Sequence, residues 1–227
     1  DALVTGSLPP PDEIADVLGP VLADGRLAMW SVHGDEQEVL DRVGASLAFP
    51  DPAGADLLSV RTQNKGNNKI DVFQRREVEH EVSFDPGTGR VDATISVTLH
   101  NDAPAWGLPD AVIGSNDQGL PLGTSVVYLS VYTPFALEAA ALDAERIGVE
   151  FHRELGVSVY SRYIEIGPGG SATLQVQVTG RLEGPRYALL VVPQPTVGGD
   201  DYRIGLEPTE RWRIADTSSV GPIGFGQ

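Results

Sequence analysis

Apolar residues near the start of the chain recur every three or four positions, which is the spacing of one face of an α-helix. Asp12 and Glu13 suit the first turn of such a helix and Gly25 its end. Residues 26–32 then read as a short strand and 35–43 as a second helix. We therefore expect residues 1–56 to form a small α/β segment packed on the domain that follows. The positions that define the first helix are Ile14, Val17, Leu18, Val21 and Leu22.

From Leu57 onward the apolar period changes to two, which is the period of a strand with one buried face. Two such runs flank the turn sequence DPGTG at 85–89 and predict an antiparallel hairpin. Further strands are predicted at 124–133, 157–166, 171–180 and 186–195. The run Val126–Val131 is apolar on both faces and predicts a central strand. The glycine-rich residues 167–172 lie between two strands, so we read them as a hairpin turn and not as a phosphate-binding loop.

Seven or more antiparallel strands without alternating long helices favour a mainly β fold, namely an immunoglobulin-like antiparallel β-sandwich over residues 57–215. Residues 216–227 would then be a flexible tail. One connection, 101–124, breaks the regular spacing: it contains three prolines, four glycines and Trp106. Loops of this length are uncommon inside compact domains, so it is either a flap packed over one end of the sandwich or a functional loop.

The formal net charge of −16 argues against binding nucleic acid or anionic lipid through a broad basic surface. The chain has no cysteine, which excludes disulfides and thiolate chemistry. It also has no apolar run long enough to span a membrane. Any membrane attachment would thus need a segment that this chain does not contain, and a start at Asp1 suggests a processed or excised form.

Catalytic motifs are missing from the sequence. No G-x-S-x-G turn is present to expose a serine nucleophile, and the four histidines are scattered over different elements. His80 lies on the apolar face of a predicted strand, which favours a hydrogen-bonded core histidine. Glu77, Glu79 and Glu81 share one strand face and read as a solvated row, although a fold could still bring carboxylates together into a hydrolytic site.

Metal and cofactor motifs are also missing, so we expect neither. Paired oxygen donors could capture calcium in loops, but such pairs are also ordinary turn formers. The candidate pairs are Asn101 with Asp102, Asn116 with Asp117, and Asp200 with Asp201.

The only two lysines of the chain lie together in the stretch RTQNKGNNKIDVFQRR, residues 61–76. This stretch is either a tight turn into a strand or a loop that meets an anionic sugar or a partner's carboxylate. Tyrosines on the strands could offer flat faces for sugars, although aromatic residues in strands are usually core. The candidate ligand-binding residues are Asn64, Lys65, Asn68, Lys69 and Trp106.

Six segments in this order resemble the C-terminal, exported part of an actinobacterial family of proteins, domain-of-unknown-function family 4012. They are RLAMWSVHGDEQEVLDRVG, NKGNNKIDVFQRREVEHEV, LHNDAPAWGLPDAVIG, VYTPFA, ELGVSVYSRYIEIGPGGSATLQVQVTG and YALLVVPQPTV, and the resemblance as a whole covers residues 14–207. The resemblance implies an extracellular or cell-surface protein of the bacterial envelope with an N-terminal membrane anchor. It implies no activity and no catalytic residues.

These observations together favour a non-enzymatic cell-envelope module that binds or organises a glycan or an envelope protein. Two alternatives remain open. One is a carboxylate-dependent enzyme that acts on envelope polysaccharide, which would need a cleft with converging carboxylates of perturbed pKa. The other is a structural spacer domain, which would lack a pocket and an exposed aromatic patch.

Overall fold

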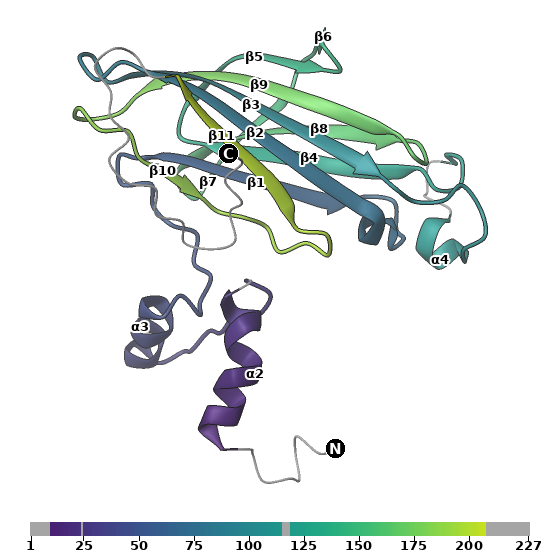
Figure 1. Cartoon of the computed structure of the whole chain (residues 1–227), viewed down its shortest axis with the longest axis horizontal. Coiled ribbons are helices and arrows are strands. Elements are labelled where there is room, and N and C mark those ends of the chain that lie inside the picture. Colours follow the sequence, from purple (N-terminus) through teal and green to yellow (C-terminus); the bar gives the residue numbers. More distant parts are fainter. Residues whose placement is uncertain (1–9, 24, 115–118, 208–227) are drawn as a thin grey trace. The chain divides into compact units, whose positions relative to one another are not determined.

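A computed structural model describes residues 10–23, 25–114 and 119–207 of the chain (Figure 1). The chain divides into two compact units, the first ending at Pro50 and the second beginning at Asp51. The sequence placed this boundary after residue 56, where the first strand begins. The predicted tail, 216–227, lies outside the described residues.

The first unit is helical in its described part. Its helices are α2 (Pro11–Ala23) and α3 (Gly34–Arg42), close to the two predicted from the apolar spacing. The strand predicted at 26–32 is wrong, because no strand is assigned there and the described part of this unit offers no neighbouring strand to pair with it. Trp30 and Val32 are 77% and 74% exposed, so the apolar run that suggested a strand is on the surface.

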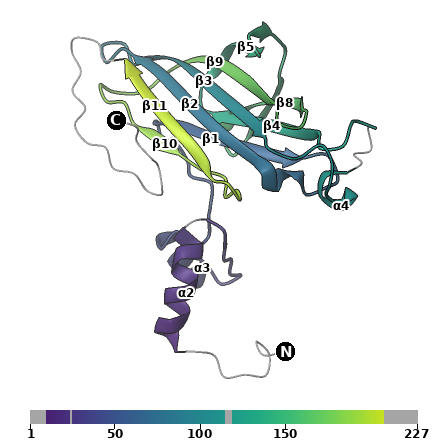
Figure 2. The same ribbon diagram turned by 45° about the vertical axis from the view of Figure 1, so that its right-hand side comes forward.

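The second unit consists of two sheets on a common apolar core (Figures 1 and 2). The order in the five-stranded sheet is β10-β1-β4-β8-β7, and the order in the six-stranded sheet is β11-β2-β3-β9-β5-β6. The strands are β1 (Asp56–Asn64), β2 (Gln74–Phe84), β3 (Arg90–Asn101), β4 (Ser125–Thr133), β5 (Ala136–Leu142), β6 (Glu145–Arg146), β7 (Glu150–Glu154), β8 (Val157–Ile166), β9 (Ser171–Arg181), β10 (Leu189–Val191) and β11 (Asp200–Glu207).

Both sheets are mixed, and this corrects the all-antiparallel prediction. Strand β10 pairs with β1 in parallel, and β11 pairs with β2 in parallel. Strands β10 and β11 both lie in the last part of the described chain. The sequence predicted one strand there, at 186–195, and missed β11. In the turned view, β11 lies along β2 in one layer while β10 lies beside β1 in the other (Figure 2). The sequence also missed β5, β6 and β7.

The predicted hairpin is present as β2 and β3, whose residues alternate between buried and solvated positions. Gly89 closes its turn with φ of 73°, and a Cβ there would meet the carbonyl oxygen of Leu182. Strand β4 lies between β1 and β8, as its apolar character predicted. The glycine-rich turn at 167–170 does connect two strands, but β8 and β9 belong to different sheets. It is therefore a link between sheets and not a hairpin turn.

Candidate binding surfaces

The candidate residues gather at one end of the second unit, in two segments that we call the tip: residues 64–73 and 102–124, of which 115–118 are outside the described residues. The tip contains η1 (Ile70–Phe73) and the short helix α4 (Asp110–Ile113), which appears at one end of the sheets in Figure 1. A small buried cluster of Ile70, Ala103 and Ile113 joins the two segments. The predicted loops therefore form one structure.

Asn64 and Asn68 point inward and hold the tip together. Asn64 Nδ2 donates to the carbonyl of Asn68 at 2.8 Å and to Asp71 Oδ1 at 3.0 Å. Asn68 Nδ2 donates to the carbonyl of Gly114 at 2.9 Å, across to the second segment. Their side-chain amides thus hydrogen-bond to backbone carbonyls of the tip, as expected if this stretch forms a tight turn.

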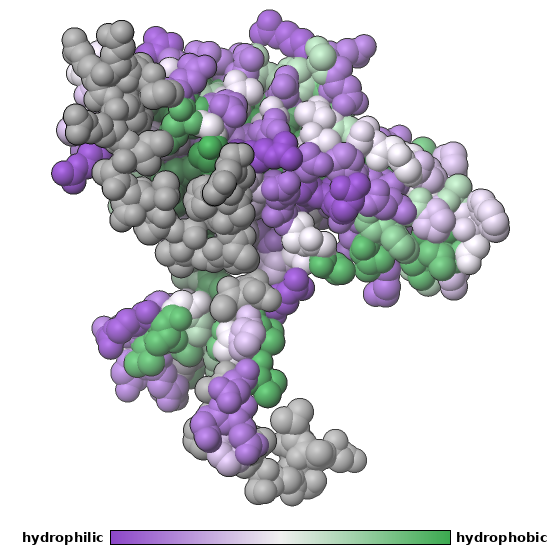
Figure 3. Space-filling view, viewed as in Figure 1, coloured by the Kyte–Doolittle hydropathy of each residue, from purple (hydrophilic) through white to green (hydrophobic). Residues whose placement is uncertain are grey.

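Lys65, Lys69 and Trp106 differ from the asparagines because they are exposed, Trp106 to 80%. Lys69 also lines an open cavity of about 420 Å³. Figure 3 shows hydrophobic residues around α4, in keeping with the exposed apolar side chains that this part of the chain carries. The lining of the cavity is Asn64, Asn67, Asn68, Lys69, Asp71 and Val72.

Two of the three possible calcium pairs are occupied by structural contacts. Asn101 is buried, and its amide donates to the carbonyls of Gly123 and Ile166 at 2.7 and 2.8 Å. Asp102 pairs with Arg75, and this contact holds the pKa of the Asp102 carboxyl below its usual value. The pair 116–117 lies outside the described residues. No grouping of three metal-ligating side chains occurs in the part of the chain that the structure describes.

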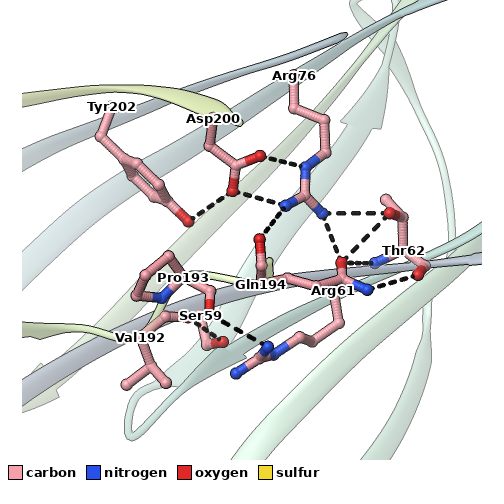
Figure 4. Close-up of polar contacts among 9 residues, drawn as sticks. All are labelled: Ser59, Arg61, Thr62, Arg76, Val192, Pro193, Gln194, Asp200 and Tyr202. Atoms are coloured by element: carbon pink, nitrogen blue, oxygen red, sulfur yellow. Dashed lines mark hydrogen bonds and ion pairs between the residues drawn. The ribbon is translucent and has the colours of Figure 1, made fainter. Parts of the chain in front are cut away.

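The third pair contains Asp200, which forms a buried ion pair with Arg76 of the neighbouring strand in the six-stranded sheet (Figure 4). Arg76 Nε and Nη2 donate to its two carboxylate oxygens, each at 2.6 Å. Arg76 Nη1 donates to Gln194 Oε1 at 2.7 Å and to Thr62 Oγ1 at 3.1 Å. The Tyr202 hydroxyl donates to Asp200 at 3.1 Å. These residues come from β1, β2, β11 and the segment after β10, so the cluster joins both sheets.

A second buried cluster joins the same strands nearer the start of β1. His80 Nε2 lies 2.9 Å from Asp56 Oδ2, and both side chains are 0% exposed. The Tyr187 hydroxyl donates to the same oxygen at 2.5 Å, and burial raises the pKa of this phenol strongly. The prediction of a hydrogen-bonded core histidine is thus confirmed. A catalytic Ser-His-Asp triad would need a serine beside this histidine, but the third residue here is Tyr187. The Asp56–His80 pair is also fully buried, so a substrate cannot reach it.

The predicted glutamate row lies on the outer face of the six-stranded sheet, where Figure 3 shows hydrophilic residues over β2 and β3. Glu77 contacts His100 at 3.1 Å and Glu79 contacts Arg203 at 3.1 Å. Glu81 lines an open cavity of about 220 Å³ with Asp92 and two further carboxylates, Glu138 and Glu207. Hydrogen bonds from Arg90 lower the pKa of Asp92, the opposite of what a catalytic acid requires.

The sequence did not separate the tyrosines on the outer face of a sheet from those in the core. Tyr160 and Tyr202 are both 3% exposed and point inward. Tyr128, Tyr132 and Tyr163 lie on the outer face of the five-stranded sheet, which we call the tyrosine face. Strand β4 is apolar on both sides, so its sequence alone does not reveal which parity faces the core; in the structure Val127, Leu129 and Val131 belong to the core.

Comparisons with known proteins add little. No protein-family model and no curated protein matches the chain. Among solved structures, a putative nutrient binding protein from Legionella pneumophila aligns with 56% of this chain and 44% of its own, at 6% identity and a TM-score of 0.36. An M1 zinc metallopeptidase from Deinococcus radiodurans aligns with 48% of this chain and 20% of its own, at 14% identity and a TM-score of 0.25. Similarities this low carry no argument about function.

The chain thus spans less than half the length of each of these proteins. Within the described ranges, no helix combines the length and apolar character needed to cross a membrane.

Proposed function

We propose that this chain is a non-enzymatic, immunoglobulin-like module of a bacterial cell envelope, and that its tip binds a carboxylate-bearing glycan or protein at the cell surface. The main support for this proposal is the position of the two lysines. In a chain of net charge −16, the only two lysines are exposed together on the tip. An ammonium group there can meet a carboxylate that the rest of the surface repels.

The surroundings of Lys69 support this role. The cavity beside it is also lined by Asn64, Asn67 and Asn68, and hydrogen bonds within the tip hold the side chains of Asn64 and Asn68 in fixed positions. Rigid polar groups bind a ligand with less loss of conformational entropy than mobile ones. Trp106, 80% exposed on the same tip, adds an apolar surface beside which a ligand can pack.

An enzymatic role has less support. The buried Asp56–His80 pair has no access to a substrate, and two of the three glutamates in the row on β2, Glu77 and Glu79, are paired with His100 and Arg203. A hydrolytic site would need a carboxyl group whose pKa is raised, whereas hydrogen bonds from Arg90 and Arg75 lower the pKa values of Asp92 and Asp102.

The lysine pair allows a direct test. A carbodiimide joins an amine to a carboxylate in contact with it. The amines of this chain are the α-amino group at its start and the side chains of Lys65 and Lys69. We expect the protein, added to bacterial envelope fragments and treated with carbodiimide, to form adducts that map to Lys65 or Lys69. The double variant Lys65→Arg, Lys69→Arg keeps the charge and should still bind but lose the adducts. The double variant to Glu should not bind.

The matched control is Arg75→Ala, an exposed cation near the tip that is already paired with Asp102, and its binding should be unchanged. Adducts that persist in the arginine variant and map to this protein's carboxylates would show that partner amines react with those carboxylates, and would overturn the proposal. Unchanged binding of the glutamate variant would do the same.

A further inference from the structure

Strand β7 lies at the end of the five-stranded sheet, so among the strands that the structure describes it has a neighbour on one side alone. All five of its residues are exposed, and none is a proline or a glycine, which would hinder the pairing of a further strand. The backbone N–H and C=O groups on its outer edge can therefore pair with a strand of another chain.

The even-numbered residues of β7 lie on the tyrosine face. Glu150 and Glu154 accept hydrogen bonds from tyrosine hydroxyls of β4 at 2.8 and 2.9 Å. His152 lies between them and points the same way, because side chains alternate along a strand. The side chains of His152 and Glu150 are 56% and 53% exposed. An imidazole and a carboxylate are thus neighbours on one face of an open strand edge.

Phe151 lies on the other face of β7, which is the face toward the core. Its ring stacks on that of Tyr160, with centroids 5.7 Å apart and planes inclined by 29°. Tyr160 is 3% exposed, whereas Phe151 is 58% exposed. The apolar core therefore continues to the edge of the sheet and is open there, and a second apolar ring beside Phe151 would remove it from water.

A second copy of β7 fits this edge in one register. A two-fold axis perpendicular to the sheet pairs the two strands antiparallel and keeps equivalent faces together. When the axis passes beside Phe151, this residue is opposite Phe151 of the second copy, and Glu150 is opposite His152 twice, once on each side of the axis. Opposite charges directly across an antiparallel pair stabilise it, and like charges there destabilise it.

The other registers of this edge bring like charges together. An axis beside residue 150 or 154 places a glutamate opposite its own copy, and an axis beside residue 152 places Glu150 opposite Glu154. An axis beside residue 153 places Arg153 opposite its own copy. Of the five registers centred on a residue of β7, the one centred on Phe151 is thus the only one that pairs opposite charges without pairing like charges.

We propose that two copies of this chain associate edge to edge through β7, in the register centred on Phe151. Their five-stranded sheets then form one continuous sheet, with two Glu150–His152 pairs on the tyrosine face and a Phe151 pair on the core side. The net charge of −16 opposes the approach of two copies, so their association depends on these local contacts. The interface uses no residue of the tip and is independent of the tip's ligand.

Cysteine cross-linking tests the register directly, because the chain has no cysteine of its own. Phe151→Cys should form disulfide-linked dimers under mild oxidation, since directly opposite residues of antiparallel strands are close enough for a disulfide. His152→Cys and Arg153→Cys should not link to their own copies, because each lies at least one diagonal step, about 7–8 Å, from its copy. Val197→Cys, at an exposed position outside β7, is the control and should not link.

Sedimentation velocity over a series of concentrations measures the association of the unmodified chain, which should form dimers. His152→Glu replaces both Glu–His contacts by Glu–Glu contacts, and should raise the dissociation constant of the dimer about tenfold or more. Gln175→Glu adds a carboxylate on the outer face of the other sheet. It is the matched control for the added charge, and its dimer should dissociate at the same concentration as that of the unmodified chain.

Three results would overturn the proposal. A chain that stays monomeric at every concentration would leave this edge to a strand of another protein. Self-linking of His152→Cys or Arg153→Cys in place of Phe151→Cys would show a different register. Equal dissociation constants for His152→Glu and the unmodified chain would place the dimer contact on another surface. None of these results depends on whether the tip binds a ligand.

Discussion

Two buried clusters join the same strands of the two sheets, and each contains an aspartate, a basic side chain and a tyrosine. In the Arg76 cluster, both oxygens of Asp200 accept hydrogen bonds and the guanidinium has three further acceptors in Thr62 and Gln194. In the His80 cluster, both donors reach a single oxygen of Asp56. Its other oxygen, Oδ1, and His80 Nδ1 are buried without a partner.

The difference follows from the shapes of the two basic groups. A planar guanidinium presents five N–H donors in a fixed fork, so it can bind a carboxylate with two bonds and still reach a neighbouring strand. An imidazole has two nitrogens on opposite sides of its ring. When one meets Asp56, the other must point into the apolar core. A buried charge is therefore compensated more completely by arginine than by histidine at this position.

The largest expected effect is at the Arg76 cluster. Asp200→Asn leaves the Arg76 guanidinium buried without a counter-charge, which should lower the free energy of unfolding by about 3–5 kcal/mol. Urea denaturation followed by circular dichroism measures this change. A loss below about 1 kcal/mol would show that the bidentate pair is no more important than an exposed one.

Alkaline pH tests the tyrosines of both clusters together. Burial raises the pKa of Tyr187 and of Tyr202, while unfolded phenols ionise near pH 10. The folded protein thus keeps protons that the unfolded chain has lost. This contribution to stability is complete below about pH 10 and is lost as the pH rises further, by about 1.4 kcal/mol per pH unit for each such proton. Phenolate absorbance and denaturant midpoints should show this fall starting near pH 10, and a flat profile there would contradict it.

Removing one hydroxyl at a time should distinguish the clusters. Tyr187→Phe leaves Asp56 with His80 as its single donor and should cost about 1–3 kcal/mol. Tyr202→Phe should cost about 1 kcal/mol, since Asp200 keeps both guanidinium bonds. Thermal and urea unfolding measure both losses. If the two variants lose the same free energy of unfolding, the unpartnered atoms of the His80 cluster carry no penalty.

The smallest effect is expected at the exposed ion pair on the same two strands. Arg203 and Glu79 contact each other at 3.1 Å across β11 and β2, but their side chains are 59% and 47% exposed. Glu79→Gln should change the free energy of unfolding by less than about 1 kcal/mol, and by less still at high salt. This variant is the control for Asp200→Asn, because both pairs join an arginine and a carboxylate on directly paired residues of β11 and β2, one pair buried and the other exposed.

The sequence predicted the parts of the fold that follow a regular pattern. His80 was placed correctly, because valines at 78 and 82 define the buried face of β2. Arg76 lies on that same face two residues earlier, but an arginine beside Arg75 and Glu77 reads as a solvated position. Its partner is 124 residues away, and nothing local marks Asp200 as buried. Long-range compensation of a charge has no signature in a single sequence.

The candidate site was predicted in part. Asparagine and glycine correctly indicated a turn, and grouped lysines identified an exposed loop. The sequence did not show that residues 64–73 and 102–124 form one tip, since this depends on contacts such as that between Asn68 and Gly114. It raised the strand tyrosines as possible binding faces but did not show which of them lie on the outer face, because this depends on how β4 packs between β1 and β8.

The two parallel strands have a consequence for the order in which the protein can fold during synthesis. Contacts of β1 with the last segment connect residues 131–133 positions apart, as in Ser59 with the carbonyl of Val192. Until residues 187–207 leave the ribosome, β1 and β2 have no outer neighbours, and open strand edges invite association with other chains. Such distant pairings also form slowly. Nascent chains of this protein should therefore depend on chaperones until their last strands are available.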